Sequence, residues 1–231
     1  KAGTLRSPEG RSYRIKDFIP RFVDDDAYTY TFSKQRQIVR QHLEQYQLAG
    51  VGPEEEKLFF RSTGFSREGW TGGSTLDAGC GYGRFLRVVK DMPGEYVGVD
   101  YSASSIDLAY DLVGAHENVH LVQGDILRLP FRAHSFQRIF SIGVLHQTPS
   151  TRRAFEALLP LLAPGGEIGI WVYERRSKRW VDRWRMVTTR LPLSVVYAWC
   201  IVNEVLLHRV RSLPVVGGPI ATLVPGGQND D

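Results

Sequence analysis

The stretch TLDAGCGYGRF, residues 75–85, decides the fold of this chain. A short apolar lead ends in Asp77, and glycines at 79, 81 and 83 then alternate with other residues before an apolar helix begins. Glycine tolerates positive φ and carries no Cβ atom that would keep a ligand away from the backbone. Free N–H groups at the start of a helix face polar or anionic groups. The stretch therefore predicts a strand, a tight turn and a helix start, which serve either a ligand or a plain structural turn.

Residues 74–173 alternate strand and helix signals, which predicts an α/β fold with an open, doubly wound, mostly parallel and Rossmann-like sheet. After the first strand, the predicted strands are 96–100, 119–123, 135–141 and 167–172, and the predicted helices are 84–91, 103–113 and 149–162, the last ended by Pro164-Gly165-Gly166. Ligands of such sheets bind beyond the carboxyl ends of the strands, where the strand order reverses. Polar residues fall at or near those ends, namely Asp77, Asp100, Asp125 and Ser141.

These positions indicate a cofactor that carries adenosine. A carboxylate at Asp100 can accept hydrogen bonds from both ribose hydroxyls. Asp125 followed by Ile126 offers an acceptor for an exocyclic amine beside an apolar contact for a purine. The alternatives are a solvated turn residue at Asp100 and a loop aspartate at Asp125. The dinucleotide fingerprint requires G-x-G-x-x-G, whereas this chain has G-x-G-x-G, which disfavours a nicotinamide-dependent oxidoreductase.

Five segments together resemble the class I S-adenosylmethionine-dependent methyltransferases, and most closely the ubiquinone/menaquinone-type branch of small-molecule enzymes: residues 76–83, 97–100, 124–131, 141–149 and 162–170. The resemblance implies the class I methyltransferase fold, S-adenosylmethionine as cofactor and S-adenosylhomocysteine as product. It also implies that the methyl acceptor is a small molecule, which could be lipophilic. A catalytically silent cofactor-binding or scaffold protein remains the alternative.

The resemblance also implies a role for each matched residue. The methionine end of the cofactor would be lined by Asp77, Ala78, Gly79, Cys80, Gly81 and Gly83. Asp100 with Tyr101 would bind the ribose, and Asp125 with Ile126 the adenine. Ser141 and Ile142 would lie beneath the sulfonium, with residues 143–146 approaching the substrate. No metal ligand is expected.

A sulfonium methyl is already activated, so catalysis mainly requires alignment of the acceptor and exclusion of water. Where the acceptor is a hydroxyl or an acidic carbon, a general base helps, and His146 is the candidate. A purely structural hydrogen-bonding role for His146 is the alternative. Tyr173 follows the last predicted strand and could orient the substrate, although packing is favoured for it.

Residues 1–73 are expected to be an accessory segment with two helices, one from Ser33 to Leu48 and one over 53–63. They would cover one end of the sheet or form a lid that uses the aromatic residues of 28–32. The segments 5–10 and 19–22 resemble a zinc-ribbon-like segment that precedes some members of this superfamily. The metal-binding cysteines are absent here, so no zinc is inferred. Similar proteins have Gln-Trp where this chain has Gln35-Arg36, which weakens the lid interpretation.

Residues 174–231 are expected to be helical and to set specificity. Arginines and lysines interleave with tryptophans over 175–185, and three interpretations stay open: a solvated face, a site for an anionic substrate or membrane surface, and, least favoured, nucleic acid. The apolar helix 194–207 needs a partner, which could be the core, a substrate, a second subunit or lipid. Contact with lipid would be peripheral and would involve residues 175–207. The antiparallel hairpin that closes the sheet in similar enzymes is not evident.

Composition sets the wider frame. The chain has 231 residues, 42% of them hydrophobic, and a formal net charge of +4, which is too small to imply nucleic acid by itself. Two cysteines, Cys80 and Cys200, do not make a disulfide framework and suit a reducing compartment. No signal pattern occurs at the start of the sequence, and the apolar run 191–207 is interrupted by polar residues, so a cytoplasmic location is expected.

Overall fold

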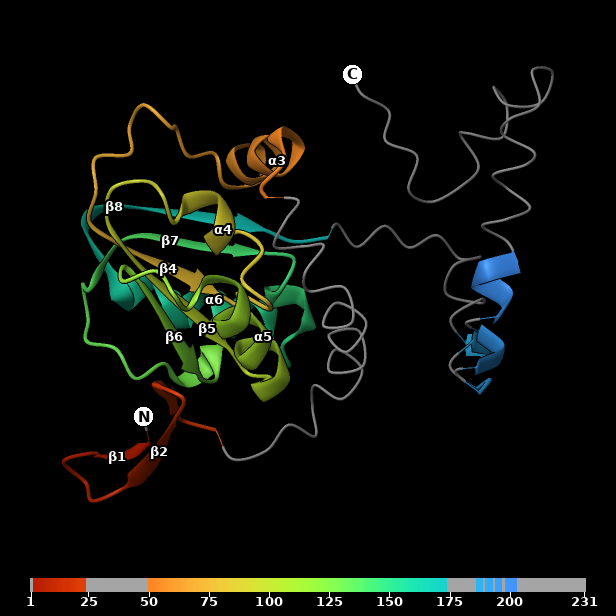
Figure 1. Ribbon diagram of the computed structural model, residues 1–231, viewed down its shortest axis with the longest axis horizontal. Coiled ribbons are helices and arrows are strands. Elements are labelled where there is room, and N and C mark those ends of the chain that lie inside the picture. Colours follow the sequence, from red (N-terminus) through yellow and green to blue (C-terminus); the bar gives the residue numbers. More distant parts are fainter. Residues whose placement is uncertain are drawn as a thin grey trace. The chain divides into compact units, whose positions relative to one another are not determined.

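The computed structural model describes residues 2–23, 50–173, 186–188, 190–192, 194–196 and 198–202. Its contacts divide the chain into two compact units, residues 1–173 and residues 174–231. The first unit contains the sheet and its helices (Figure 1). The N-terminal residues that the sequence assigned to an accessory segment belong to this same unit.

Five parallel strands form the centre of the sheet, in the order β6-β5-β4-β7-β8. Their bounds are β4, Ser74–Ala78; β5, Glu95–Asp100; β6, Val119–Gln123; β7, Phe136–Ile142; and β8, Leu162–Trp171. From β4 the chain adds β5 and then β6 on one side, and it afterwards adds β7 and β8 on the other side of β4. The order therefore reverses at β4, and the predicted doubly wound class I methyltransferase fold is confirmed.

Neighbouring residues of each strand point to opposite faces of the sheet, and helices cover both faces. Phe140 of β7 packs in the cluster that includes residues of α3 (Pro53–Thr63), α4 (Leu86–Val89) and α5 (Ala103–Val113). Its neighbour Ile139 packs in the second cluster, with α6 (Thr151–Leu158) and the short helices η2 (Ile126–Arg128), η3 (Leu145–Gln147) and η4 (Leu159–Leu161). The predicted helices 53–63 and 103–113 and the predicted strand 119–123 have the bounds observed for α3, α5 and β6.

The N-terminal addition begins with a strand meander, which the sequence did not predict, and it also contains the predicted helix α3. Strands β1 (Gly3–Arg6), β2 (Ser12–Lys16) and β3 (Ile19–Arg21) pair antiparallel, and β3 then joins the edge of β6 in parallel (Figure 1). Asp17 and Phe18 make the two-residue turn between β2 and β3 with φ of 53° and 65°. Such positive values suit the tight turns that match strand twist. The predicted helix 33–48 lies outside the described residues.

Other predicted boundaries were wrong. Strand β8 starts at Leu162 and passes through Pro164-Gly165-Gly166, because a register shift opposite 136–138 and a φ of 74° at Gly165 accommodate that sequence. Helix α6 starts two residues after Pro149, where the Ser150 hydroxyl accepts a hydrogen bond from the backbone N–H of Arg153, and it ends at Leu158. Helix α4 covers only 86–89 of the predicted 84–91.

The second unit is described only in short pieces. Residues 186–188, 194–196 and 198–202 are helical, and the apolar side chains of Val195, Trp199 and Ile201 are exposed. No strand follows β8 among the few described residues of 174–231, and the remaining residues of that range lie outside the described part of the chain, so the closing hairpin is not tested. None of the described helices combines the length and the apolar character needed to cross a membrane.

Candidate functional site

A pocket of about 790 Å³ opens at the carboxyl ends of the parallel strands. Its floor comes from the turn after β4, the residues after β5 and β6, and the loop after β7. Helix α3 and the end of β8 complete its walls. The volume falls in the range of small-molecule sites, roughly 300–1,000 Å³. The pocket lies where the strand order reverses, which is where sheets of this kind bind ligands.

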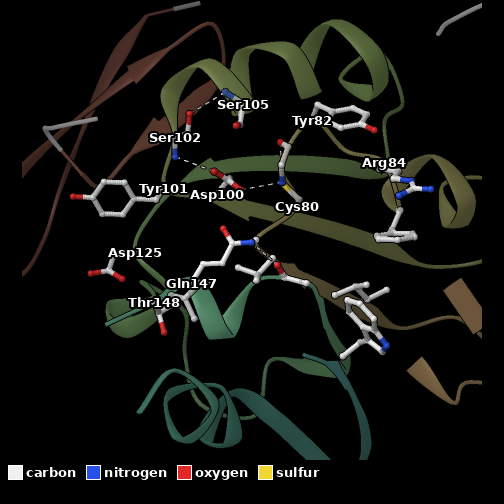
Figure 2. A pocket seen from close by; sticks show the side chains of 18 of the residues that line it. Cys80, Tyr82, Arg84, Asp100, Tyr101, Ser102, Ser105, Asp125, Gln147 and Thr148 are labelled. Atoms are coloured by element: carbon white, nitrogen blue, oxygen red, sulfur yellow. Dashed lines mark hydrogen bonds between the residues drawn. The ribbon is translucent and has the colours of Figure 1, made fainter. Parts of the chain in front are cut away.

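Eight of the predicted cofactor-binding residues line this pocket: Gly79, Cys80, Gly81, Asp100, Tyr101, Asp125, Ile126 and Ile142. Five predicted site residues do not line it: Asp77, Ala78, Gly83, Ser141 and His146. In Figure 2, Tyr101 and Asp125 lie on one side of the pocket and Arg84 on the other, with Asp100 and Cys80 between them.

Asp100 connects the two backbone segments that border the pocket. Its Oδ2 accepts the backbone N–H of Gly81 at 2.9 Å, and its Oδ1 accepts that of Ser102 at 2.9 Å. Ser102 in turn caps α5, since its hydroxyl accepts the N–H of Ser105. Each carboxylate oxygen can accept more than one hydrogen bond. Asp100 is therefore held in a fixed orientation while its carboxylate faces the pocket.

The glycine turn is shaped by close approach as well as by its dihedral angles. The N–H groups of Gly79 and Cys80 both donate to the carbonyl of Val99, at 2.8 and 2.9 Å. A Cβ atom on Gly79, where φ is 92°, would lie 2.4 Å from the side chain of Val144. Gly83 instead faces α5, where an added Cβ would meet Val113 at 3.2 Å. Gly79 thus allows Val144 to pack directly on the turn, and Gly83 allows the turn to pack on α5.

Asp77 sits under this floor and is almost fully buried, at 2% exposure. Its Oδ2 has no hydrogen-bond partner among the described residues. Burial, together with the nearby negative charge of Asp100, raises the pKa of the Asp77 carboxyl well above its usual range. A buried acceptor without a donor is costly. A cationic or N–H-bearing ligand group would remove that cost.

The adenine side of the predicted site is built on β6 and η2. The Asp125 side chain caps η2 by accepting the N–H of Leu127 at 2.9 Å, while Ile126 is buried below it. Gln123, at the end of β6, donates its amide N–H to the carbonyl of Tyr101 at 3.1 Å. Asp125, Ile126 and Tyr101 thereby form one rim of the pocket.

The opposite side is aromatic. Trp171 and Tyr173 line the pocket at the end of β8, and their ring centroids lie 4.8 Å apart. The His146 ring contacts that of Tyr173 edge to face at 4.8 Å, and its Nδ1 is buried without a hydrogen-bond partner among the described residues. Ser141 points away from the pocket lining, because its hydroxyl donates to the Ala78 carbonyl at 2.6 Å and ties β7 to β4.

Sequence reasoning missed several pocket residues. Leu58 and Ser62 of α3, Phe85, Trp171, Gln147 and Thr148 all line the cavity. The spacing of four between Leu58 and Ser62 places both on one helix face, which was a readable signal. The position of Trp171 at the end of the last parallel strand was another. In the described part of the chain, no cluster of three or more His, Cys, Asp or Glu side chains could hold a metal ion.

Comparisons with known proteins agree with this geometry. Residues 76–170 match a family model described as "Methyltransferase domain". The mouse protein "Probable tRNA methyltransferase 9B" is 30% identical over 130 residues, which cover 54% of this chain and 28% of that protein. The "2-phytyl-1,4-naphtoquinone methyltransferase" of Thermosynechococcus vestitus is 25% identical over 181 residues, which cover 66% of this chain and 80% of that protein.

Solved structures agree on the fold. The YcgJ protein of Bacillus subtilis superposes with a TM-score of 0.50 at 21% identity, over 66% of this chain and 68% of that one. A chain of the Haloferax volcanii complex between the Trm112 methyltransferase activator and a methyltransferase also gives 0.50, at 22% identity, over 70% of this chain and 68% of that chain.

Residues 76–170, less than half of the chain, match the methyltransferase family model, and the strand order and the position of the pocket agree with the fold of class I S-adenosylmethionine-dependent methyltransferases. The cofactor of this class is S-adenosylmethionine, as the sequence predicted. The chain spans between 26% and 29% of the length of the first curated relatives it matches.

Proposed function

We propose that this protein binds S-adenosylmethionine in the pocket above β4, β5 and β6 and transfers its methyl group to a small, lipophilic acceptor. The observation that carries the proposal is the placement of Asp100, which faces the pocket while it joins the glycine turn to the start of α5. Asp125 and Ile126 line the same pocket and would bind the base.

The residues fit this cofactor. Asp77 does not line the pocket, but its unpaired buried oxygen lies under the glycine turn and could accept a hydrogen bond from the ammonium end through a bridging water. The absence of a Cβ at Gly79 lets Val144 pack against the glycine turn, and both residues line the pocket. When bound, S-adenosylmethionine supplies a methyl group activated by its positive sulfur. The protein then has to orient the acceptor and exclude water.

The acceptor would lie on the β7–β8 side of the pocket. Leu58, Phe85 and Trp171 supply apolar surface there, and Asp100 and Asp125, the acidic residues of the described lining, lie on the cofactor side. An uncharged or anionic, apolar acceptor suits such a wall. The naphthoquinone methyltransferase of T. vestitus matches this chain over most of its own length, which supports a small acceptor. The relatives named as tRNA methyltransferases match over a smaller share of their length, which gives tRNA less support.

His146 remains the candidate general base. Its Nδ1 has no hydrogen-bond partner in the described part of the chain, and its ring contacts Tyr173, which lines the pocket. A neutral imidazole can take a proton from an acceptor hydroxyl or acidic carbon, which here requires the acceptor to reach past Tyr173, because His146 itself does not line the pocket.

Calorimetric titration of S-adenosylmethionine and S-adenosylhomocysteine into the wild type and Asp100→Ala tests the cofactor. Loss of a charge-assisted contact is expected to weaken binding by about 1.5–3 kcal/mol, roughly ten- to a hundredfold. Glu117→Ala is the matched control, because Glu117 is an exposed carboxylate outside the pocket. A folded wild type that binds neither compound would leave a scaffold protein as the better description.

Labelled methyl transfer tests the acceptor. With labelled cofactor, we expect label in a 1,4-naphthoquinol added as a solvent-extractable acceptor and none in added tRNA. Label in tRNA alone would refute the small-acceptor part of the proposal and leave the cofactor assignment intact.

A further inference from the structure

The N-terminal meander reaches the cofactor site through one buried side chain. Arg21 ends β3, and only 10% of its side chain is exposed. Its Nη2 donates to Oδ1 of Asp107 on α5 at 2.6 Å, and its Nη1 donates to Oε1 of Gln123 at 3.3 Å. The guanidinium therefore joins α5 and the end of β6, the two elements that border the nucleoside end of the pocket.

Gln123 passes this contact on to the pocket. It is paired with Asp100 across β5 and β6, and its side-chain amide donates to the carbonyl of Tyr101. The backbone carbonyl of Gln123 accepts the backbone N–H of Phe22, the residue after Arg21. The meander thus contacts Gln123 through both side chain and backbone, one residue before Gly124-Asp125. Tyr101 and Asp125 both line the pocket.

Stability alone gives little reason for an arginine here. The Nε of Arg21 is buried and has no hydrogen-bond partner in the described part of the chain. Leaving a donor unpaired costs free energy, and a well-packed apolar residue often fills such a site at equal or greater stability. The planar fork, in contrast, fixes two elements relative to each other.

We infer that Arg21, which lies outside the matched methyltransferase domain, is a positioning residue for the nucleoside end of the cofactor site, acting through Gln123 and Tyr101. This inference rests on the proposed function, since it concerns how the same pocket binds S-adenosylmethionine. Arg21 touches neither the described pocket lining nor the reacting atoms, so its effect is expected on affinity. The meander then has a role beyond covering the edge of β6.

The test is calorimetry on the full chain with S-adenosylhomocysteine and with 5′-methylthioadenosine, which has the nucleoside end but no amino acid. Arg21→Ala is expected to weaken both by similar factors of roughly 3- to 30-fold. Arg14→Ala is the matched control: Arg14 pairs with Arg21 in the strand register but is exposed, and its loss should change affinity less than about twofold.

A double-mutant cycle examines the route. Gln123→Leu should weaken both ligands, and the double variant should be no weaker than the poorer single variant, because both changes interrupt one path. Additive losses would overturn the route through Gln123. A folded Arg21→Ala protein with the affinity of Arg14→Ala, even if it melts at a lower temperature, would overturn the inference itself.

The remaining outcomes are also decisive. If Arg21→Ala does not fold, Arg21→Lys keeps the charge near Asp107 but loses the fork, and it should still bind both ligands more weakly than the wild type. Wild-type affinity in Arg21→Lys would count against the inference. Failure of the folded wild type to bind S-adenosylhomocysteine would refute the proposed function first, which separates the two results.

Discussion

Asp77 carries the clearest electrostatic consequence at the scale of single residues. Its pKa is raised by burial and by Asp100, so the folded protein holds a proton on this carboxyl that the unfolded chain releases near pH 4. Above that pH, and up to the raised pKa, the folded state binds more protons than the unfolded state. The free energy of unfolding contributed by Asp77 therefore falls as pH rises through this window.

Asp77→Asn removes that titration. The free energy of unfolding of the variant should therefore fall less steeply with rising pH than that of the wild type. Urea unfolding at several pH values measures this difference. Asparagine keeps an uncharged oxygen acceptor but cannot release a proton when the ammonium group binds, so the affinity for S-adenosylmethionine should drop roughly tenfold or more. Equal pH dependence in the two proteins would show that Asp77 is ionised normally in the folded state.

Gly79 is a second residue whose identity the structure explains. Gly79→Ala places a Cβ within 2.4 Å of Val144 at a φ of 92°. We expect a loss of about 1–3 kcal/mol of stability in denaturant unfolding, and no measurable cofactor binding where the turn shifts. Gly10→Ala is the control for strain alone, since φ there is 82° but an added Cβ meets nothing within 4 Å. Similar losses in both variants would mean that contact with Val144 is unimportant.

Much of this end of the pocket was predictable at this scale, because the carboxyl ends of parallel strands meet at one edge of the sheet and their polar residues are therefore brought together. Asp100, Asp125 and Ile126 line the pocket as predicted. The acceptor side was harder to predict. Leu58 and Trp171 look like ordinary core residues in the sequence, and only the packing of α3 and β8 around one cavity brings them together.

At the scale of elements, α3 is fixed to the sheet by Phe59. This side chain has no exposed surface, and its ring centroid lies 5.1 Å from that of Phe140 and 6.0 Å from that of Phe85. Anchoring of α3 places Leu58 and Ser62 at the pocket. The helix is also tied to the glycine turn by the ion pair of Glu55 with Arg84 at 3.0 Å.

Phe59→Ala should therefore lower the free energy of unfolding by about 3–5 kcal/mol, the usual cost of removing a large buried ring. Phe155→Ala, at a position that is 36% exposed on α6, should cost far less. Chemical denaturation of both variants measures the difference. A small loss for Phe59→Ala would mean that α3 is not anchored by this contact.

Elements with ordinary signals were the predictable ones. Helices α3 and α5 have a helix-favouring start at Pro53 and Ser102, and β6 is a plain apolar strand. Strands β1 and β2 were missed because they are short, polar and largely exposed, so the pairing along the meander and not the local pattern determines them. Strand β8 was cut short because Pro-Gly-Gly usually ends an element, whereas here it forms an irregularity in the strand.

At the scale of the whole molecule, binding of a ligand to the folded state should raise its stability. With S-adenosylhomocysteine at 100 times its dissociation constant, the gain is about 2.7 kcal/mol. The melting temperature should rise by roughly 5–10 °C for a chain of this size. Differential scanning fluorimetry measures the shift, and Asp100→Ala at the same ligand concentration should show a much smaller one. Equal shifts in both proteins would place the ligand elsewhere.

The meander on β6 also determines which backbone edge the sheet presents to other molecules. A bare parallel strand exposes a row of N–H and C=O groups that can pair with another chain. In this protein β3 covers the end of β6, and the outermost strand is β1, which is four residues long and ends in Arg6. Short, charged outer strands resist self-association. A fragment cut to the matched domain, residues 76–170, would lose this protection, and we expect it to self-associate more readily than the full chain.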